Sequence, residues 1–255
     1  MAYQDIIFSN VDGIARITFN RPHVLNALSP QLMSEWLDAM KKISVDNSIK
    51  VLIVKGEGRA WSAGVDLQAL NEGIQGGQFS SDQILLDGCE IIRLLQSINA
   101  VTIAAVNGFC YTGATEMMMA FDLVYAANEA KIGDTHAKWG IAPKWGMTQR
   151  LPQRVGFQKA MEMSFTCIPV DGIEAERIGL VNKSVPLTEL DIYVDGVAKH
   201  ILGNSAQTVS AMKNLYYQGM HTTLKEGLAI EYQADVQIND RQEFLLGFKE
   251  NKTKA

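Results

Sequence analysis

Alternating and continuous apolar runs predict several β-strands in the first half of the chain. Ile14 to Phe19 alternates between apolar and polar positions and is rich in β-branched residues, as is typical of a half-buried strand. Lys50 to Lys55 and Val101 to Val106 are short, almost continuously apolar runs, which are expected of strands covered on both faces. Leu123 to Ala127 adds a further strand. A sheet with a buried centre is therefore expected.

Helical spacing separates these strands and then dominates the end of the chain. Pro30 to Ile43 predicts an amphipathic helix, with Ser29 as its N-cap and Pro30 in the first turn. Gln68 to Ser81, rich in Gly and Ser, predicts a mobile loop that leads into a helix from Asp82 to Ser97. From Asp191 onward we expect helices only, over Tyr193 to Leu202, Ala206 to Tyr217 and Thr222 to Val236.

The alternation of strands and helices favours the α/β class. The loss of strand patterns near Asp195–Gly196 places a boundary there. We therefore expect a core over residues 1–195 and a helical region over residues 196–255. No repeat of solenoid length is present.

Composition and charge narrow the class of partner. Of the 255 residues 47% are hydrophobic and 20% charged, as in ordinary soluble domains, and the net charge of −5 gives no sign of a nucleic-acid partner. We see neither a signal peptide nor a run that would span a membrane, so a cytoplasmic location without membrane attachment is expected. The isolated cysteines, Cys89, Cys110 and Cys167, indicate neither a disulfide framework nor a metal site.

A turn after the strand at Val101 to Val106 carries the first candidate chemistry. Small residues around Gly113 lead into a helix start, where free backbone N–H groups and the helix dipole can hold an oxyanion. Glu116 follows three residues later, in the first helical turn. It either stabilises its own helix or directs a carboxylate at the bound ligand.

A second strand-to-turn segment, Gly58 to Leu67, has the same character. Together the two segments resemble the enoyl-CoA hydratase/isomerase (crotonase) superfamily, whose members carry an F-x-A-G-x-D-L-like loop and an N-G-x-x-x-G-G-x-x-E-like turn. Further matches occur in the family's order: Asn20-Arg21-Pro22 with Asn26-Ala27-Leu28, Asp122 to Ala127, Gly140-Ile141-Ala142-Pro143, and Thr148-Gln149-Arg150-Leu151-Pro152. The resemblance covers nearly the whole chain and is weakest after Gly196.

The resemblance implies a spiral of ββα units with a C-terminal helical region used for oligomerisation, as a homotrimer or a dimer of trimers. It also implies an acyl-CoA thioester as substrate. Carried over residue by residue, the backbone N–H groups of Ala63 and Gly113 would form the oxyanion hole. The coenzyme A part would contact Arg21, Ala63, Gly64, Val65, Asp66 and Gly113. Arg21 can equally be a solvated charge, and Asp66 can cap the next turn.

One position departs from the family pattern. Family hydratases use a pair of glutamates, and the second of them is replaced here by His136, within Gly133 to Gly140. Glu116 would act as general base, and His136 as general acid, since a histidine is readily protonated near neutral pH. Alternatively His136 is structural and hydrogen-bonded by Asp134. The loss of the second glutamate argues against a simple double-bond isomerase.

An enoyl-CoA hydratase, a lyase, is the reading we favour. An acyl-CoA hydrolase or decarboxylase of the same fold and a non-catalytic acyl-CoA-binding protein stay open as alternatives. No metal or redox cofactor is expected, because the thioester and the oxyanion hole supply the activation.

Aromatic residues beside the motifs add a hint about the acyl group. Trp61, Tyr111, Trp139 and Trp145 can line an acyl pocket, although each is as readily a core residue. Trp145 and Lys144 replace small residues of the family's Pro-Gly-x-Gly-Gly stretch. This replacement points to a short, compact or unusual acyl group.

Overall fold

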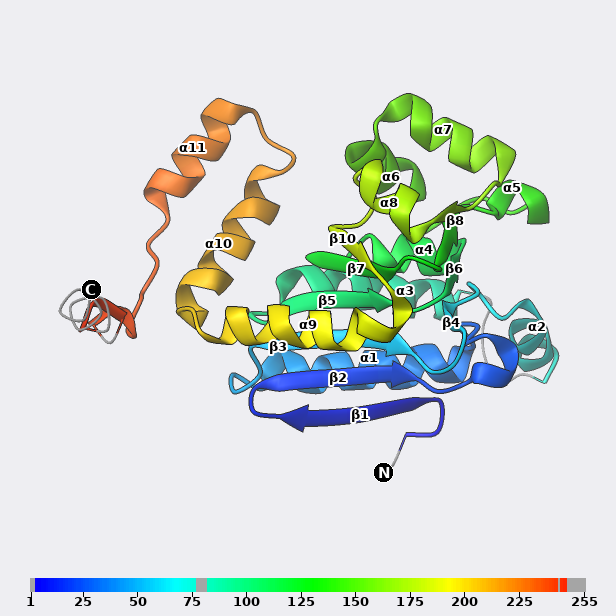
Figure 1. The fold of residues 1–255 in the computed structure, drawn as a ribbon, viewed down its shortest axis with the longest axis horizontal. Coiled ribbons are helices and arrows are strands. Elements are labelled where there is room, and N and C mark those ends of the chain that lie inside the picture. The colour runs from blue at the N-terminus through cyan, green and yellow to red at the C-terminus, as the bar shows by residue number, and fades with distance from the viewer. Residues whose placement is uncertain (1–2, 77–81, 243, 247–255) are drawn as a thin grey trace.

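Two β-sheets form the centre of the protein, whose computed structural model describes residues 3–76, 82–242 and 244–246 (Figure 1). The larger sheet has the strand order β1-β2-β3-β5-β7-β10, formed by Ile6–Val11, Ile14–Phe19, Val51–Gly56, Val101–Val106, Leu123–Ala127 and Lys183–Val185. β1 pairs with β2 antiparallel, and every other pair in this sheet is parallel. The smaller sheet has the order β4-β6-β8-β9, formed by Ala60–Ser62, Phe109–Tyr111, Lys131–Gly133 and Val170–Asp171.

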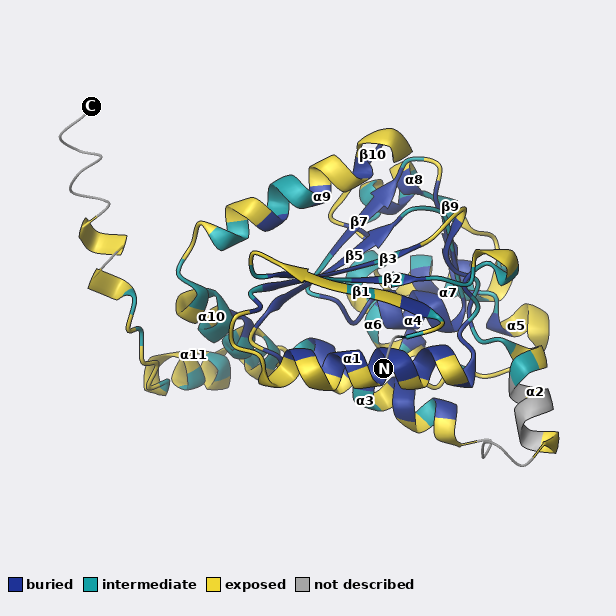
Figure 2. Cartoon of the chain, turned by 90° about the horizontal axis from the view of Figure 1, so that it is seen from below, coloured by how far each residue is buried: buried dark blue, intermediate teal, exposed yellow. Residues whose placement is uncertain are grey.

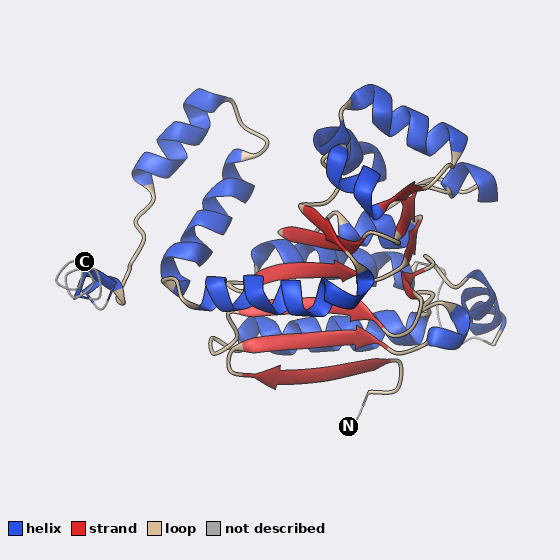
Figure 3. Cartoon of the chain, viewed as in Figure 1, coloured by secondary structure: helices blue, strands red, loops and turns tan. Residues whose placement is uncertain are grey.

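The two sheets are linked in a repeating way that confirms the predicted spiral of ββα units. The long strands β3, β5 and β7 are each followed in the chain by a short strand of the smaller sheet, β4, β6 and β8, and then by a helix. In Figure 3 the short strands run across the direction of the long ones. The segments that leave β4, β6 and β8 are therefore brought together at one edge of the molecule.

Helices cover both faces of the larger sheet (Figure 2). The structure places them at Pro22–Val24 (the 3₁₀ helix η1), Pro30–Val45 (α1), Leu67–Gln75 (α2), Gln83–Ser97 (α3), Gly113–Met118 (α4), His136–Trp139 (α5), Met147–Val155 (α6), Phe157–Thr166 (α7), Gly172–Arg177 (α8), Leu187–Leu202 (α9), Ala206–Gly219 (α10) and Leu224–Gln233 (α11). α1 and α3 pack against each other on one face, while α9 lies along β7, β5 and β3 on the other. Ser29 caps α1 as predicted, accepting a hydrogen bond from the N–H of Leu32.

An aromatic cluster fills the core beneath the loops that follow the strands. The ring centroid of Phe19 lies 4.9 Å from that of Trp36 and 5.3 Å from that of Trp61, and Phe121 packs on both indoles. The indole N–H of Trp61 donates to the carbonyl of Val54 at 3.1 Å. Trp61 therefore belongs to the core, and the cluster gives the neighbouring turns a rigid base.

The segment expected to be a mobile loop is partly helical. α2 occupies Leu67–Gln75, because Asp66 accepts a hydrogen bond from the N–H of Ala69 and so caps the first turn. Residues 77–81, the remainder of the predicted loop, lie outside the described residues.

The boundary predicted at Asp195–Gly196 falls within α9, which crosses it without a break. α9 is packed on the large sheet along its length, so the chain turns away from this sheet only after Leu202. α10 keeps contact with β5, and α11 lies farther from the sheets, as Figure 1 shows. Within the described ranges, no helix combines the length and apolar character that crossing a lipid bilayer requires.

Candidate active site

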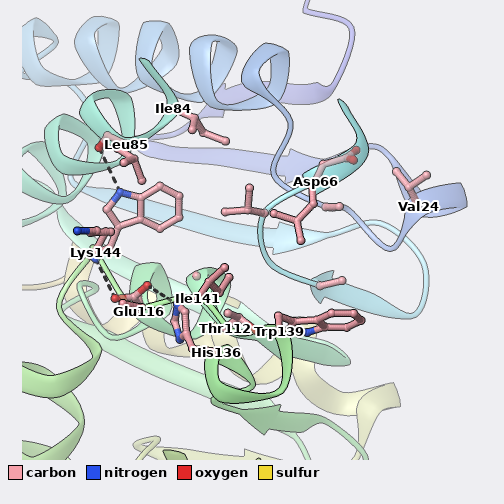
Figure 4. A pocket seen from close by; sticks show the side chains of 17 residues that line it. Val24, Asp66, Ile84, Leu85, Thr112, Glu116, His136, Trp139, Ile141 and Lys144 are labelled. Carbon is pink, nitrogen blue, oxygen red and sulfur yellow. Dashed lines mark hydrogen bonds and ion pairs between the residues drawn. The ribbon is translucent and has the colours of Figure 1, made fainter. Parts of the chain in front are cut away.

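A cavity of about 480 Å³ opens where the ends of β4 and β6 meet α3, α4 and α5. Its walls are mainly apolar, with a small number of polar groups among them, which is the usual composition of a ligand pocket. Glu116 and His136 lie close together in it, at a distance from Asp66 (Figure 4). The lining residues are Val24, Ala27, Ala63, Val65, Asp66, Leu67, Ile84, Leu85, Thr112, Gly113, Glu116, His136, Trp139, Ile141, Ala142, Lys144 and Trp145.

Glu116 is held in one orientation by the loop that precedes α6. Its Oε1 accepts hydrogen bonds from the backbone N–H groups of Trp145, at 2.8 Å, and Met147, at 2.9 Å. The residue is only 1% exposed, and it lies in the first turn of α4, where the helix dipole favours a negative charge. Its second oxygen, Oε2, remains directed at His136.

His136 lies between two carboxylates. Its Nε2 is 3.3 Å from Oε2 of Glu116, and its Nδ1 is 2.6 Å from Oδ1 of Asp134. The same Oδ1 accepts the backbone N–H of His136 at 3.0 Å, so Asp134 fixes both the ring and the start of α5. The row Asp134–His136–Glu116 therefore ends in the cavity with a carboxylate and a ring nitrogen side by side.

The two carboxylates decide the protonation of the imidazole. Burial by itself favours the neutral ring, but the hydrogen bonds to Asp134 and Glu116 outweigh it and raise the pKa of His136 to about 9. Burial also disfavours the charged form of Asp134, yet its hydrogen bonds to His136 and Ser164 lower the pKa of that carboxyl. At neutral pH His136 is thus an imidazolium, an acid with a proton to give.

Of the two backbone N–H donors that were expected beside this pair, those of Ala63 and Gly113, only the second is free of an acceptor in the described part of the chain. The N–H of Ala63 donates to the carbonyl of Leu25 at 3.0 Å, so it is not available to a ligand, and the assignment of Ala63 to an oxyanion hole is wrong in this structure. Val65 and Gly113 also line the cavity, and neither of their N–H groups has an acceptor among the described residues.

Gly64 explains why the donor shifts by two residues. Its φ of +97° reverses the chain direction after Ala63, and a Cβ at this position would lie 2.9 Å from the carbonyl oxygen of Tyr111 and 3.7 Å from the nitrogen of Gly113. Only glycine fits this close approach. The turn thereby brings the N–H of Val65 next to the start of α4.

Thr112, which precedes Gly113, has a strained backbone. Its φ of 56° and ψ of −119° are values that residues with a Cβ rarely adopt. Its hydroxyl makes a short hydrogen bond with the hydroxyl of Thr135, the residue before His136. The side chain thus joins the turn that carries the Gly113 donor to the turn that carries His136.

Comparisons with known proteins agree with this architecture. The family model described as enoyl-CoA hydratase/isomerase matches residues 9–254. The chain is 34% identical to a crotonyl-CoA hydratase of Syntrophomonas wolfei, over 92% of this chain and 89% of the relative, and 32% identical to a short-chain-enoyl-CoA hydratase of Clostridium acetobutylicum with the same coverage. The crystal structure of an enoyl-CoA hydratase from Bacillus anthracis superposes with a TM-score of 0.89, at 29% identity, and covers 97% of both chains.

The chain belongs to the enoyl-CoA hydratase/isomerase family. The predicted α/β crotonase fold and the predicted resemblance are both confirmed. Six of the predicted site residues line one cavity in this family member. They are Ala63, Val65, Asp66, Gly113, Glu116 and His136.

Arg21 and Gly64 are not among the cavity-lining residues. The guanidinium of Arg21 donates to Oδ2 of Asp66 at 2.9 Å and to the carbonyl of Ala27 at 2.7 Å, with 14% of its side chain exposed. It is therefore neither a solvated charge nor a free cation, and it holds the Asp66 loop in place. Asp66 lines the cavity and also caps α2.

The aromatic predictions divide between the core and the cavity. Trp139 and Trp145 line the cavity, whereas Tyr111 does not and Trp61 is a core residue. Sequence reasoning missed the apolar wall formed by Ile84 and Leu85 of α3. The pattern of α3 offered no signal for this role, since these residues read as ordinary positions of an amphipathic helix.

Proposed function

We propose that the protein adds water to the α,β-double bond of an enoyl-CoA thioester. The observation that carries this proposal is the contact of Glu116 with a protonated His136 beside two free backbone N–H groups. A base, an acid and an oxyanion hole are the groups that such an addition requires. The relatives named as hydratases support the same activity.

The thioester carbonyl oxygen accepts hydrogen bonds from the N–H groups of Val65 and Gly113. Addition at the β-carbon turns this carbonyl into an enolate, so negative charge grows on the oxygen in the transition state. The two donors are already in position before this charge develops, and they lie in a mostly apolar cavity. In other enzymes the removal of one such donor raises the activation free energy by roughly 3–4 kcal/mol. The dipole of α4 adds to the same effect at Gly113.

Two proton transfers complete the addition. Glu116 takes a proton from water through Oε2 as the oxygen bonds to the β-carbon. His136 gives its Nε2 proton to the α-carbon as the enolate collapses. The product carries both elements of water, and the site is left with a protonated Glu116 and a neutral His136.

The 3.3 Å contact between these groups restores the starting state. A proton passes from Oε2 of Glu116 to Nε2 of His136, and the raised pKa of His136 favours its return to the imidazolium. Asp134 keeps the ring oriented throughout. We propose that no metal or redox cofactor takes part, because Glu116 and His136 account for both proton transfers.

The raised pKa of His136 favours hydration over hydrolysis. A histidine that activates water for attack on a thioester must be neutral, whereas His136 is charged at neutral pH. Glu116 lines the cavity and is not turned away from it, as it would be in a simple binder of acyl-CoA. These two features support the hydratase over a hydrolase with a histidine base and over a simple binder of acyl-CoA.

The test follows the double bond and the thioester at the same time. With crotonyl-CoA, we expect loss of the conjugated thioester absorbance without release of thiol, and a decrease in kcat of about 10²–10⁴-fold in Glu116→Gln. Thiol release would overturn the proposal in favour of a hydrolase. Binding of crotonyl-CoA without turnover would favour the non-catalytic binder.

The oligomeric state and the location of the protein are proposed from other observations. We infer a homotrimer or a dimer of trimers, supported by exposed apolar side chains on the projecting helices, including Tyr216 of α10 and Leu224, Leu228 and Tyr232 of α11. A cytoplasmic location is supported by Cys89, Cys110 and Cys167, all free thiols. Sedimentation of the purified protein tests the oligomer.

A further inference from the structure

The indole of Trp145 forms one end wall of the cavity. Trp145 is hydrogen-bonded to Leu85 and to Glu116, and Figure 4 shows these two residues at the end of the cavity away from Val24 and Asp66. Trp145 lines the cavity although only 4% of the residue is exposed, so its ring is closely packed by neighbouring side chains. Since Glu116 is the proposed base and acts on the acyl group, the wall lies on the acyl side of the proposed thioester position.

Three hydrogen bonds fix Trp145 in this place. The indole N–H donates to the carbonyl of Leu85 at 3.1 Å, and the backbone N–H donates to Glu116 at 2.8 Å. The carbonyl of Trp145 accepts from the guanidinium of Arg150 at 2.5 Å. A side chain whose ring and backbone are both anchored does not easily move aside for a ligand.

Two glycines provide the space for the ring. A Cβ on Gly88 of α3 would lie 2.4 Å from Cε2 and 2.6 Å from Cζ2 of Trp145, and a Cβ on Gly113 of α4 would lie 2.8 Å from Cζ3. All three distances are too short for a real Cβ atom. Gly88 is thus the helical position that permits a tryptophan at residue 145, although a glycine within a helix is destabilising in itself.

The ring contacts Gly113 at the point where the acyl group would begin. Val65 also lies beside Gly113, since its Cγ2 is 3.5 Å from the position that a Cβ on Gly113 would take. An acyl chain attached to a carbonyl held by these two residues therefore meets the indole within a few carbon atoms. A longer acyl chain has no space toward the indole unless the Trp145 ring moves away from Gly88.

We propose that Trp145, seated on Gly88, limits the substrate to short acyl groups. This inference rests on the proposed acyl-CoA function and deepens it by naming the substrate class. Trp145 is a specificity residue in this proposal, since it contacts the acyl group and takes no part in proton transfer. Acyl groups of the size of butyryl or crotonyl are accepted, and those of the size of octanoyl are excluded.

The test compares the binding of butyryl-CoA and octanoyl-CoA by calorimetry. These saturated thioesters cannot be hydrated, so the result does not depend on turnover. We expect the wild-type protein to bind octanoyl-CoA at least roughly tenfold more weakly than butyryl-CoA. In Trp145→Ala the affinity for octanoyl-CoA relative to butyryl-CoA should rise by at least tenfold, because the longer tail then buries more apolar surface.

Two further variants keep the test decisive if Trp145→Ala fails to fold. Trp145→Phe retains an aromatic ring but removes part of the wall, and should shift the affinity ratio in the same direction by a smaller factor. Trp61→Phe is the matched control, since it also removes a buried indole whose N–H donates to a backbone carbonyl at 3.1 Å. It should leave the ratio of the two affinities unchanged.

A glycine substitution tests the seat itself. Gly88→Ala should push the indole into the cavity and weaken butyryl-CoA binding by at least tenfold. Equal affinity of the wild-type protein for both thioesters, or an unchanged ratio in both Trp145 variants, would overturn the inference. Short-chain binding without hydration of crotonyl-CoA would instead overturn only the proposed reaction.

Discussion

Two buried ionic clusters in this protein differ in how many of their polar atoms have hydrogen-bond partners within the protein. One is the row Asp134–His136–Glu116 at the cavity. The other joins Lys213 of α10 to Asp122, which precedes β7, at 2.8 Å. Both link segments far apart in the chain, and both contain groups that are almost fully buried.

The Lys213 cluster uses all of its hydrogen-bonding capacity within the protein. Its ammonium donates to Asp122 and to the carbonyls of Leu95, at 2.8 Å, and Ala100, at 2.9 Å. Asp122 also accepts from Thr102 and from the hydroxyl of Tyr217. Burial lowers the pKa of Lys213, and Asp122 opposes this effect. With nothing left over for a ligand, this cluster attaches α10 to the core.

The row at the cavity is saturated at one end only. Asp134 and Oε1 of Glu116 are occupied by protein donors, whereas Oε2 of Glu116 and Nε2 of His136 meet each other at 3.3 Å at the cavity wall. A longer and weaker contact between two groups that face a ligand is one that a substrate can enter. Burial of charge is common to both clusters, so it is the incomplete satisfaction beside the cavity that supports the catalytic role proposed for Glu116 and His136.

The largest expected effect comes from His136→Gln. The variant keeps a polar side chain but removes the acid, and kcat for crotonyl-CoA should fall by about 10²–10⁴-fold. Steady-state kinetics check this. His200→Gln, at an exposed position of α9, is the control and should retain full activity. Near-normal turnover of His136→Gln would assign the histidine a structural role only.

Lys213→Met should damage folding and spare the chemistry. It leaves the carboxylate of Asp122 buried without its cation, which typically costs about 3–5 kcal/mol of the free energy of unfolding. Urea denaturation measures this, and kcat of the folded fraction should be unchanged. The control is Lys55→Met, which removes the more exposed ion pair with Asp191 and should cost less than about 1 kcal/mol. A similar cost for both variants would contradict the comparison.

Asp134→Asn should change the pH profile more than the rate at neutral pH. With the pKa of His136 at about 9, the imidazolium is present below that value and is lost as the pH rises through it, so kcat/KM should decline above about pH 9. Removing the charge of Asp134 lowers the pKa of His136 and moves this alkaline decline to lower pH. A pH–rate profile from 6 to 10 measures the shift. An unmoved decline would show that His136 is not the titrating acid.

The smallest effect is expected at Thr112. Replacing it by glycine relieves a backbone strain of order 1–3 kcal/mol but adds chain entropy to the unfolded state, so we expect a net stabilisation of about 1 kcal/mol. Activity should fall a few-fold because the hydroxyl contact with Thr135 is lost. Thr112→Ala loses the same hydroxyl without relieving the strain, and should be less stable than the glycine variant in thermal unfolding. The opposite order of stability would show that Thr112 is not strained.

Much of this protein could be predicted from short stretches of sequence. The strands at Ile14–Phe19, Val101–Val106 and Leu123–Ala127 have the predicted bounds, and Ser29 caps the helix that follows it. The apolar period and the capping side chain act between neighbours in the chain, so these features are encoded locally. The order of the motifs likewise identified the family and placed Glu116 in a first helical turn.

The directions of the functional groups in the site follow from contacts between segments that are distant in the chain. The resemblance implies Ala63 as an oxyanion donor, but its N–H donates to the carbonyl of Leu25, which is distant in the chain. Burial opposes the charged form of His136, while Asp134 and the more distant Glu116 raise its pKa, and the position of the Trp145 ring depends on Gly88. Local periodicity and residue type are enough to specify the elements and the chemical groups of this protein. Hydrogen-bond direction, proton affinity and cavity shape depend on contacts between distant segments, which form only when the chain is folded.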